Sequence, residues 1–257
     1  MEGIHLSLPM ANAIPPQPIP EPSVRGRHYR YYDLVMVGFV TVLLASNFIG
    51  PGKTCEVVLL GSAWKFGAGN LFFPISYIFD DVLTEVYGYA RARKVIWAGF
   101  AAMIFFNLMA YAVMGLPAAQ GEPYNAVLDP ALRTVFGNSW RIVLASMAGF
   151  WAGDFVNSYV LARMKIWTRG RWLWTRTIGS TVVGEAVDSI VFYPIAFLGI
   201  WENQTLLSVL VTNWAIKVGV EVVFTPVTYL VVNFLKRAER EDFYDHDTDF
   251  TPFSLRD

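Results

Sequence analysis

Two short stretches of the sequence carry acidic side chains in a shared pattern. Residues 153–158 read Gly-Asp-Phe-Val-Asn-Ser, and residues 184–189 read Gly-Glu-Ala-Val-Asp-Ser. On a helix the acid, the Asn or Asp three residues later and the Ser four residues later share one face. Each stretch lies in an apolar run long enough to cross a bilayer, where a carboxylate costs about 2.5–3.5 kcal/mol to insert and therefore indicates a functional site. The paired motif predicts the polar centre of a membrane transporter.

The composition argues against several other chemistries. The chain has 257 residues, 54% of them hydrophobic and only 16% charged, whereas a soluble domain carries about 25% charged residues. The single cysteine, Cys55, excludes an intrachain disulfide and a cysteine-based metal site, and the three histidines (His5, His28 and His246) lie in the tails. The sequence contains no P-loop, G-x-G-x-x-G or G-x-S-x-G motif. These features disfavour an ATPase, a zinc enzyme and a serine hydrolase, and we expect no cofactor or metal.

We divide the chain into three parts. Residues 1–29 are proline-rich without apolar periodicity, which predicts a disordered extension. They lack the continuous apolar core of a signal peptide, so we expect no cleavage. Residues 30–236 form the predicted transmembrane transporter domain. Residues 237–257 are acidic and polar, which predicts a disordered cytoplasmic tail.

Six apolar runs approach the length of about 20 residues that a spanning helix needs. They are residues 32–50, 70–87, 95–116, 142–161, 178–200 and 206–235. The predicted fold class is therefore an all-α membrane protein with six transmembrane helices. The second run is the weakest, because Asp80, Asp81 and Glu85 interrupt it. Between the first two runs, residues 55–66 combine β-branched residues with Gly-containing turns, which predicts a short hairpin at the outer surface.

Basic residues gather in alternate connections between these runs. The basic connections hold Arg25, Arg27 and Arg30; Arg91, Arg93 and Lys94; Arg163, Lys165, Arg169, Arg171 and Arg176; and Lys236, Arg237 and Arg240. Because Lys and Arg concentrate in cytoplasmic loops, this alternation predicts six helices with the N and C termini both cytoplasmic.

Steps of four residues align polar side chains on several runs. The second run carries Tyr77, Asp81 and Glu85, and the sixth carries Asn213, Lys217 and Glu221. Pro226 follows in the sixth run and should kink that helix. The six runs together contain one base, Lys217, and seven acids: Asp80, Asp81, Glu85, Asp154, Glu185, Asp188 and Glu221. So many carboxylates cannot all be ionised in hydrocarbon. Some must be protonated, paired with Lys217, exposed to water in a cavity or bound to a ligand.

The alternative is that these groups only hold helices together. Asn, Ser and Thr suffice for that purpose, so acids on several different helices favour a ligand or ion site. Asp81 lies near the cytoplasmic end of its run, where Arg91 or Arg93 is a further partner. Asp80 lies off the polar stripe, and we interpret it as structural.

Several motifs follow one another in a fixed order along the chain. They are Phe-Pro-Ile-Ser-Tyr at 73–77, Asp-Val-Leu-Thr-Glu-Val-Tyr-Gly at 81–88, Ala-Arg-Lys-Val-Ile-Trp-Ala-Gly-Phe at 92–100, then Gly153-Asp154 to Lys165, Ser180-Thr181, Gly184-Glu185, Asp188-Ser189, Phe192, Lys217, Glu221 and Pro226. This series resembles the queuosine precursor transporter family, also called the vitamin uptake transporter family. The resemblance covers about residues 30–235. It implies a fold similar to the six-helix substrate-binding subunits of energy-coupling-factor transporters. It also implies import of the 7-deazaguanines preQ0 and preQ1 across the bacterial inner membrane, for salvage into the queuosine of tRNA.

This implied substrate gives the acids a role. A 7-deazaguanine presents its N1–H and exocyclic amine side by side, and one carboxylate can accept both. A buried site made for those donors rejects analogues that lack them. We assign Glu185 or Asp188 to this edge, Asn157 to O6 or a ring nitrogen, and Phe192 or Trp214 to stacking on the base.

The remaining site residues balance charge. Asp154 and Lys217 are expected to form a counter-ion pair that keeps the unliganded site neutral. Asp81, Glu85 and Glu221 complete the predicted substrate site.

Energy coupling is open at this level. Without a nucleotide motif the chain is expected to act as a stand-alone carrier, facilitative or proton-linked, with no dedicated ATPase partner. Residues 34–48 of the first run lack the repeated small-residue pattern that would dock a coupling subunit closely. The expected partners are the small-molecule substrate and the lipid bilayer, with no nucleic acid. Gly149 and Gly153 could pack helices within or between subunits, which leaves a homo-oligomer open.

Three rival functions remain at this level. A carrier of another vitamin, a purine or an organic cation would also suit the excess of acids. An intramembrane enzyme is disfavoured, because the runs contain neither His nor Cys, and Ser158 and Ser189 have no base adjacent in sequence. A purely structural membrane protein does not account for the cost of the acids.

The basic connection between the fourth and fifth runs makes them antiparallel neighbours. Their two Gly-acid-x-x-Asx-Ser faces, at 153–158 and 184–189, are therefore expected to oppose one another across one cavity. They would then form the two halves of a guanine-binding clamp.

Overall fold

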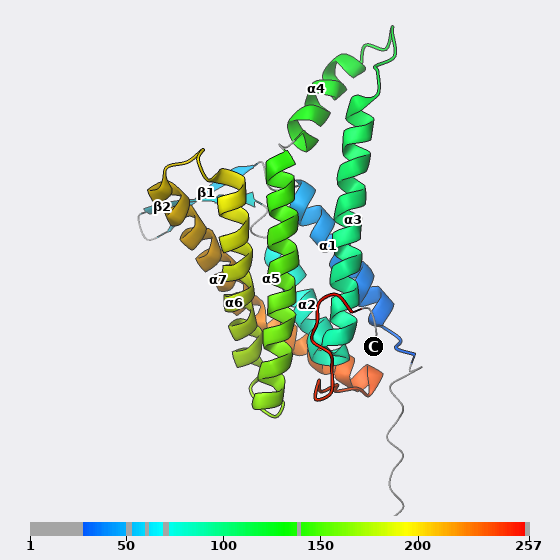
Figure 1. The fold of residues 1–257 in the computed structure, drawn as a ribbon, viewed down its shortest axis with the longest axis vertical. Coiled ribbons are helices and arrows are strands. Elements are labelled where there is room, and N and C mark those ends of the chain that lie inside the picture. The colour runs from blue at the N-terminus through cyan, green and yellow to red at the C-terminus, as the bar shows by residue number, and fades with distance from the viewer. Residues whose placement is uncertain (1–27, 50–52, 60–61, 69–71, 138–139, 255–257) are drawn as a thin grey trace, which may run out of the picture.

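The structure is a computed structural model that describes residues 28–49, 53–59, 62–68, 72–137 and 140–254. These residues form seven helices and one hairpin (Figure 1). The elements are α1 (Tyr32–Ile49), β1 (Thr54–Leu59), β2 (Ser62–Gly67), α2 (Phe73–Tyr87), α3 (Tyr89–Gly115), α4 (Asn125–Phe136), α5 (Trp140–Trp167), α6 (Leu173–Phe197) and α7 (Asn203–Glu239). The extension expected at residues 1–29 lies outside the described residues, apart from its last two.

Each of the six predicted runs overlaps one helix, and the shortest of these helices is α2, with 15 residues. Four helices of the described chain, α1, α3, α6 and α7, are long and apolar enough to cross a membrane. The protein is therefore an all-α membrane protein with several apolar helices, and the full set of six spans stays a prediction. The short helix α4 was not predicted, because at 12 residues it falls below the length of a span and it has no buried residue.

The long helices run up and down, so alternate connections lie at the same end of the bundle. In Figure 1 the α2–α3 and α5–α6 connections, the start of α1 and the end of α7 lie at the lower end, whereas the hairpin, α4 and the α6–α7 connection lie at the upper end. The lower end is thus the one that carries the basic connections. Its placement on the cytoplasmic side remains a prediction from that charge pattern.

The predicted hairpin is confirmed. Strands β1 and β2 pair antiparallel, with Thr54 opposite Gly67 and Leu59 opposite Ser62. Its location at the outer surface stays a prediction.

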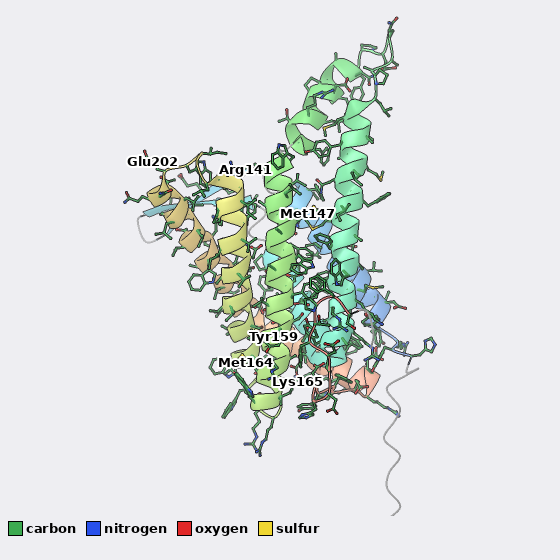
Figure 2. All side chains as sticks on the ribbon, viewed as in Figure 1. Arg141, Met147, Tyr159, Met164, Lys165 and Glu202 are labelled. Carbon is green, nitrogen blue, oxygen red and sulfur yellow. The ribbon has the colours of Figure 1, made fainter. Side chains whose placement is uncertain are left out.

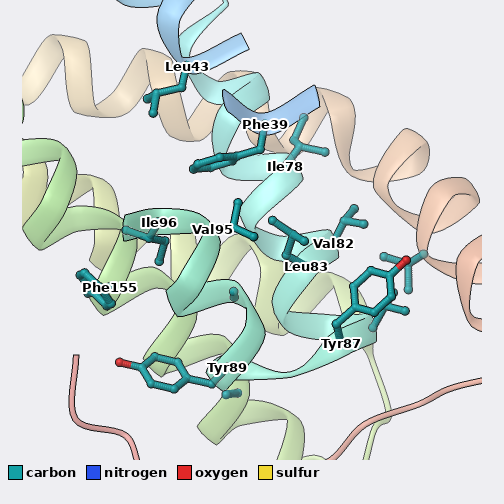
Figure 3. Packing of buried hydrophobic residues seen from close by; sticks show 14 of the residues in the cluster. Phe39, Leu43, Ile78, Val82, Leu83, Tyr87, Tyr89, Val95, Ile96 and Phe155 are labelled. Carbon is teal, nitrogen blue, oxygen red and sulfur yellow. The ribbon is translucent and has the colours of Figure 1, made fainter. Parts of the chain in front are cut away.

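Helix α2 is the central element of the bundle. It contacts α1, α3, α5 and α7, and 12 of its 15 residues are buried. One side of α2 presents Ile78, Val82 and Leu83 to an apolar cluster that includes Phe39 of α1 and Val95 of α3 (Figure 3). A helix with three acids is therefore shielded from lipid by its neighbours, which is why its own hydropathy is a poor guide to its position.

Helices α5 and α6 cross at the glycines of the two motifs. A Cβ atom added to Gly184 would lie 2.8 Å from Cβ of Asn157 and 3.0 Å from the carbonyl oxygen of Gly153. A Cβ atom added to Gly153 would lie 3.1 Å from the carbonyl oxygen of Gly184. The prediction that these helices are neighbours is confirmed. The two motif faces, however, pack directly against each other at the glycines instead of opposing across a cavity.

The expectation of a disordered C-terminal tail is wrong for the residues described. Arg93, itself buried, donates from Nη1 to the carbonyl oxygens of Asp249 and Thr251 at 2.7 and 2.6 Å, and Trp97 Nε1 donates to that of Pro252 at 2.8 Å. The rings of Phe250 and Phe253 pack on Tyr89 and Trp97. The acidic composition suggested disorder, but aromatic anchors and backbone acceptors hold the segment on the lower end of the bundle.

Two glycines make room for this tail. Gly88 has φ +87°, and a Cβ atom there would lie 2.2 Å from the ring of Phe243. Gly170 has φ +72°, and a Cβ atom there would lie 2.1 Å from the hydroxyl of Tyr244. Both turns therefore need glycine for backbone conformation and for the close approach of the tail.

A pair of alanine substitutions tests the α5–α6 crossing. Gly184→Ala should destabilise the protein by about 1–3 kcal/mol, because the added methyl group meets backbone that cannot move aside. The matched change Gly219→Ala places its methyl group in open space on α7. It should be neutral or stabilising by up to about 1 kcal/mol through helix propensity. Thermal unfolding of the purified proteins in detergent compares them, and equal midpoints would contradict the close crossing.

Candidate substrate and ion site

Four helices bring the acidic side chains together in the interior of the bundle. Asp80, Asp81 and Glu85 come from α2, Asp154 from α5, Glu185 and Asp188 from α6, and Lys217 and Glu221 from α7. All eight are buried, and Asp188 and Lys217, the most accessible of them, are 6% and 7% exposed. Their contacts divide them into three centres.

The first centre is built around Lys217. Its Nζ donates to Glu185 Oε2 at 2.7 Å and to Asp188 Oδ2 at 2.6 Å, and it lies 4.5 Å from the ring centroid of Phe73. Glu185 and Asp188 are three residues apart on α6, so one lysine from α7 reaches both. The second oxygen of Glu185 has no hydrogen-bond partner among the described residues. This centre combines a carboxylate acceptor, a cationic donor and an aromatic face.

The predicted pair between Asp154 and Lys217 is wrong. Lys217 pairs with the two acids of α6, the helix on which α7 packs, whereas both oxygens of Asp154 lack a hydrogen-bond partner in the described structure. Asp154 does lie close enough to Asp80, to the two acids of α6 and to Lys217 for electrostatic interaction. It therefore adjoins the first centre without neutralising it.

The second centre is a pair of adjacent carboxyls on α2. Asn157 Nδ2 donates to Asp81 Oδ1 at 2.8 Å and to Asp80 Oδ2 at 3.1 Å. Ser158 Oγ lies 2.8 and 2.9 Å from the two oxygens of Asp80, and Thr84 donates to Ser158 at 3.0 Å. Asp80, which we interpreted as structural, is therefore part of the polar interior. Asn157, which we assigned to the substrate, contacts these acids.

The third centre surrounds Glu85 at the lower end of the bundle. Arg176 donates from Nε and Nη2 to the two Glu85 oxygens, both at 2.7 Å, and Lys236 also donates to Glu85. The Lys165 amine lies 3.6 Å from the Glu85 carboxylate and donates to the backbone oxygen of Glu85 at 2.6 Å. Figure 2 shows Lys165 near the lower end of α5, beside the C-terminal segment.

The tail completes this third centre. Asp242 accepts from Lys165 at 2.6 Å and from Lys236 at 2.8 Å. Partial burial raises the pKa of the Asp242 carboxyl, but the hydrogen bonds and charges of the two lysines outweigh it and hold that pKa below its ordinary value. The expected pairing of Asp81 with Arg91 or Arg93 is wrong, because Arg93 binds tail carbonyls and Arg91 Nη1 donates to the carbonyl of Tyr87.

The two aromatic residues assigned to stacking make other contacts. Trp214 Nε1 donates to the carbonyl oxygen of Val182 on α6 at 3.0 Å. Phe192 lines a cavity of about 90 Å³ with Asn47, Asn107 and Ser146, next to Gly149 and one turn from Asp188. The ring in contact with Lys217 is Phe73. Its signal in the sequence was its position one turn before Tyr77 at the start of the polar stripe.

Comparison with known proteins identifies the family of this chain. Residues 67–231 match the family model described as "Putative vitamin uptake transporter". This chain belongs to that family. It is 30% identical over 207 residues to the "Probable queuosine precursor transporter" of Bacillus subtilis (strain 168), which covers 80% of this chain and 86% of the relative. It is 25% identical over 202 residues to the "Queuosine precursor transporter" of Escherichia coli (strain K12), and this match covers 76% of this chain and 83% of the relative. No solved structure matches.

Membership of a transporter family fits the three centres. The matched region contains every member of the first two centres and ends before Lys236 and Asp242. A transporter needs a polar interior that binds cargo without reacting with it. The resemblance drawn from the sequence motifs is confirmed, and the chain belongs to a family of transporters.

A conservative change tests the third centre. Arg176→Lys keeps the charge but removes the forked pair to Glu85, which should cost about 1.5–3 kcal/mol because a hydrogen bond to a buried charge is lost. The matched control is Arg171→Lys, because Arg171 is exposed. Its backbone oxygen, which accepts a hydrogen bond from Arg176, is unchanged by this substitution. Thermal unfolding should separate the two variants, and an unchanged midpoint for Arg176→Lys would contradict a closed ion cluster.

Proposed function

We propose that this protein imports 7-deazaguanine precursors of queuosine, such as preQ0 and preQ1, across the inner membrane of a bacterium. Support comes from the names of the relatives and from the chemistry of the first centre. The observation that carries the proposal is the free oxygen of Glu185 beside an amine held by two acids. A guanine-type edge needs that combination, because it offers two adjacent donors and one carbonyl acceptor.

The binding mode follows from complementary donors and acceptors. Glu185 or Asp188 accepts the N1–H and the exocyclic amine, and Lys217 donates to O6. The Phe73 ring, 4.5 Å from the Lys217 amine, lies on the same centre and replaces Phe192 and Trp214 as the stacking surface. In this binding mode hydrogen bonds to the substrate replace direct contacts of Lys217 with the two acids, so each charged group keeps a hydrogen-bond partner.

Carriage of another purine, a vitamin or an organic cation is the alternative. Binding of preQ0, preQ1, queuine and guanine to the purified protein separates these options. Tight binding of the deazaguanines, unaffected by vitamins or organic cations as competitors, is the expected result. The proposal fails if guanine, a vitamin or an organic cation binds and the deazaguanines do not.

Amide substitutions test the assigned edge in cells. Glu185→Gln and Asp188→Asn should each reduce uptake of labelled preQ0 or preQ1 at least about ten-fold, since loss of one good hydrogen bond to a charged group costs more than 1.4 kcal/mol. Uptake is measured in cells unable to make preQ0, with expression of each variant checked. The matched control is Glu202→Gln, an exposed acid before α7 (Figure 2). Normal uptake by both variants would exclude this site.

A further inference from the structure

We propose that the Asp80–Asp81 pair binds the proton whose movement drives uptake. The inference rests on the proposed transport function and assigns its energy source. It gives the second centre a role separate from substrate recognition.

The geometry holds two carboxyls around one donor. Asp80 and Asp81 are consecutive on α2, both are fully buried, and the Asn157 amide donates to one oxygen of each. Ser158 supplies Asp80 with a further donor, whereas the second oxygen of Asp81 has no hydrogen-bond partner among the described residues. Two like charges in such a site cannot both be ionised at low dielectric, so the pair retains one proton.

The positive charges of the interior are already committed. Lys217 pairs with Glu185 and Asp188, and the cations of the lower end pair with Glu85 and Asp242. In the described part of the chain, Asp80, Asp81, Asp154 and Glu221 form no ion pair, and the two oxygens of Glu221 lack a hydrogen-bond partner. The titratable groups that interact electrostatically with the Asp80–Asp81 pair are Tyr77, Glu85, Tyr89, Asp154 and Glu221. Helix α6 contributes the Ser180 hydroxyl, 3.5 Å from Asp81 Oδ1.

A proton fits this pair better than a metal ion. The described residues contain no group of three or more His, Cys, Asp or Glu side chains arranged to hold a metal. Ca²⁺ takes six to eight oxygen ligands, and most oxygens here already accept protein hydrogen bonds. A proton needs a single lone pair, which the free oxygen of Asp81 provides.

The position of Asp81 on α2 connects the pair to the other two centres. Tyr77 lies one turn before Asp81, and its hydroxyl lies at the α5–α6 crossing, where a Cβ atom on Gly153 would be 2.6 Å from it. Glu85 lies one turn after Asp81, within the cluster of the lower end. The polar stripe of α2 therefore leads from the substrate centre through the proton site to the basic cluster.

Reconstituted protein tests the coupling. In proteoliposomes with an alkaline interior, the internal concentration of labelled preQ1 or preQ0 should rise to at least ten times the external concentration. A sodium gradient alone should not drive accumulation. Asp80→Asn and Asp81→Asn should lose this accumulation but keep exchange of labelled for unlabelled substrate. Glu202→Gln should accumulate as the wild type does. Equal uptake with and without the pH gradient, or accumulation driven by sodium alone, would overturn the proposal.

A substrate-independent measurement separates this inference from the proposed function. At neutral pH the infrared spectrum should contain a carboxylic acid band that is reduced in Asp80→Asn and Asp81→Asn and unchanged in Glu202→Gln. Ser158→Ala keeps both carboxyls and should shift the pH at which this band is lost, so it serves if the amides fail to fold. A band that is unchanged in Asp80→Asn and Asp81→Asn, or, where these do not fold, a band lost at the same pH in Ser158→Ala as in the wild type, refutes the proton site even if deazaguanines bind. Failure to bind deazaguanines, with the band behaving as expected, refutes only the proposed substrate.

Discussion

The buried carboxyls of α2, α5, α6 and α7 set the constraint on which the interior depends, because positive charge is scarce there. Three cations at the lower end hold Glu85, and one lysine in the middle of the bundle holds two acids of α6. Removing either partner of such a pair leaves an uncompensated buried charge, which costs about 3–5 kcal/mol. The acids without a cation must then be neutral or solvated during part of a transport cycle. The distribution of four basic side chains thus divides one polar interior into three centres, of which the second has no cation among the described residues.

Close helix packing makes this arrangement possible. The glycines at the α5–α6 crossing bring the two motif faces into contact, so Asn157 and Ser158 of α5 reach the acids of α2. Helix α2 is enclosed by four neighbours, and its apolar side anchors it against α1 and α3. A charged helix can therefore be central in a membrane protein because its neighbours, and not its own composition, separate it from lipid.

The sequence predicted the helices well and the side-chain pairing poorly. Apolar length located the helices, β-branched residues with Gly-containing turns located the hairpin, and the polar residues within the apolar runs located the buried acids, whereas Phe73 was missed. Pairing depends on which helix packs on which, and a periodic pattern does not contain this information. Lys217 was therefore assigned to Asp154 when it pairs with Glu185 and Asp188. Arg176, Lys165 and Lys236 were interpreted only as loop charges, although Glu85 holds all three. The tail was predicted to be disordered because of its acidic composition, whereas its aromatic rings determine how it packs.

The ordered tail connects the lower end of the bundle to the charge constraint. Asp242 binds the same two lysines that bind Glu85, and the Lys165 amine also donates to the carbonyl oxygen of Phe243 at 2.7 Å. Lys165 and Lys236 therefore each lie between a buried acid of α2 and an acid of the tail that is 45% exposed. Because the two lysines are shared by Glu85 and Asp242, the charge at the lower end of the α2 stripe is linked to the position of the tail.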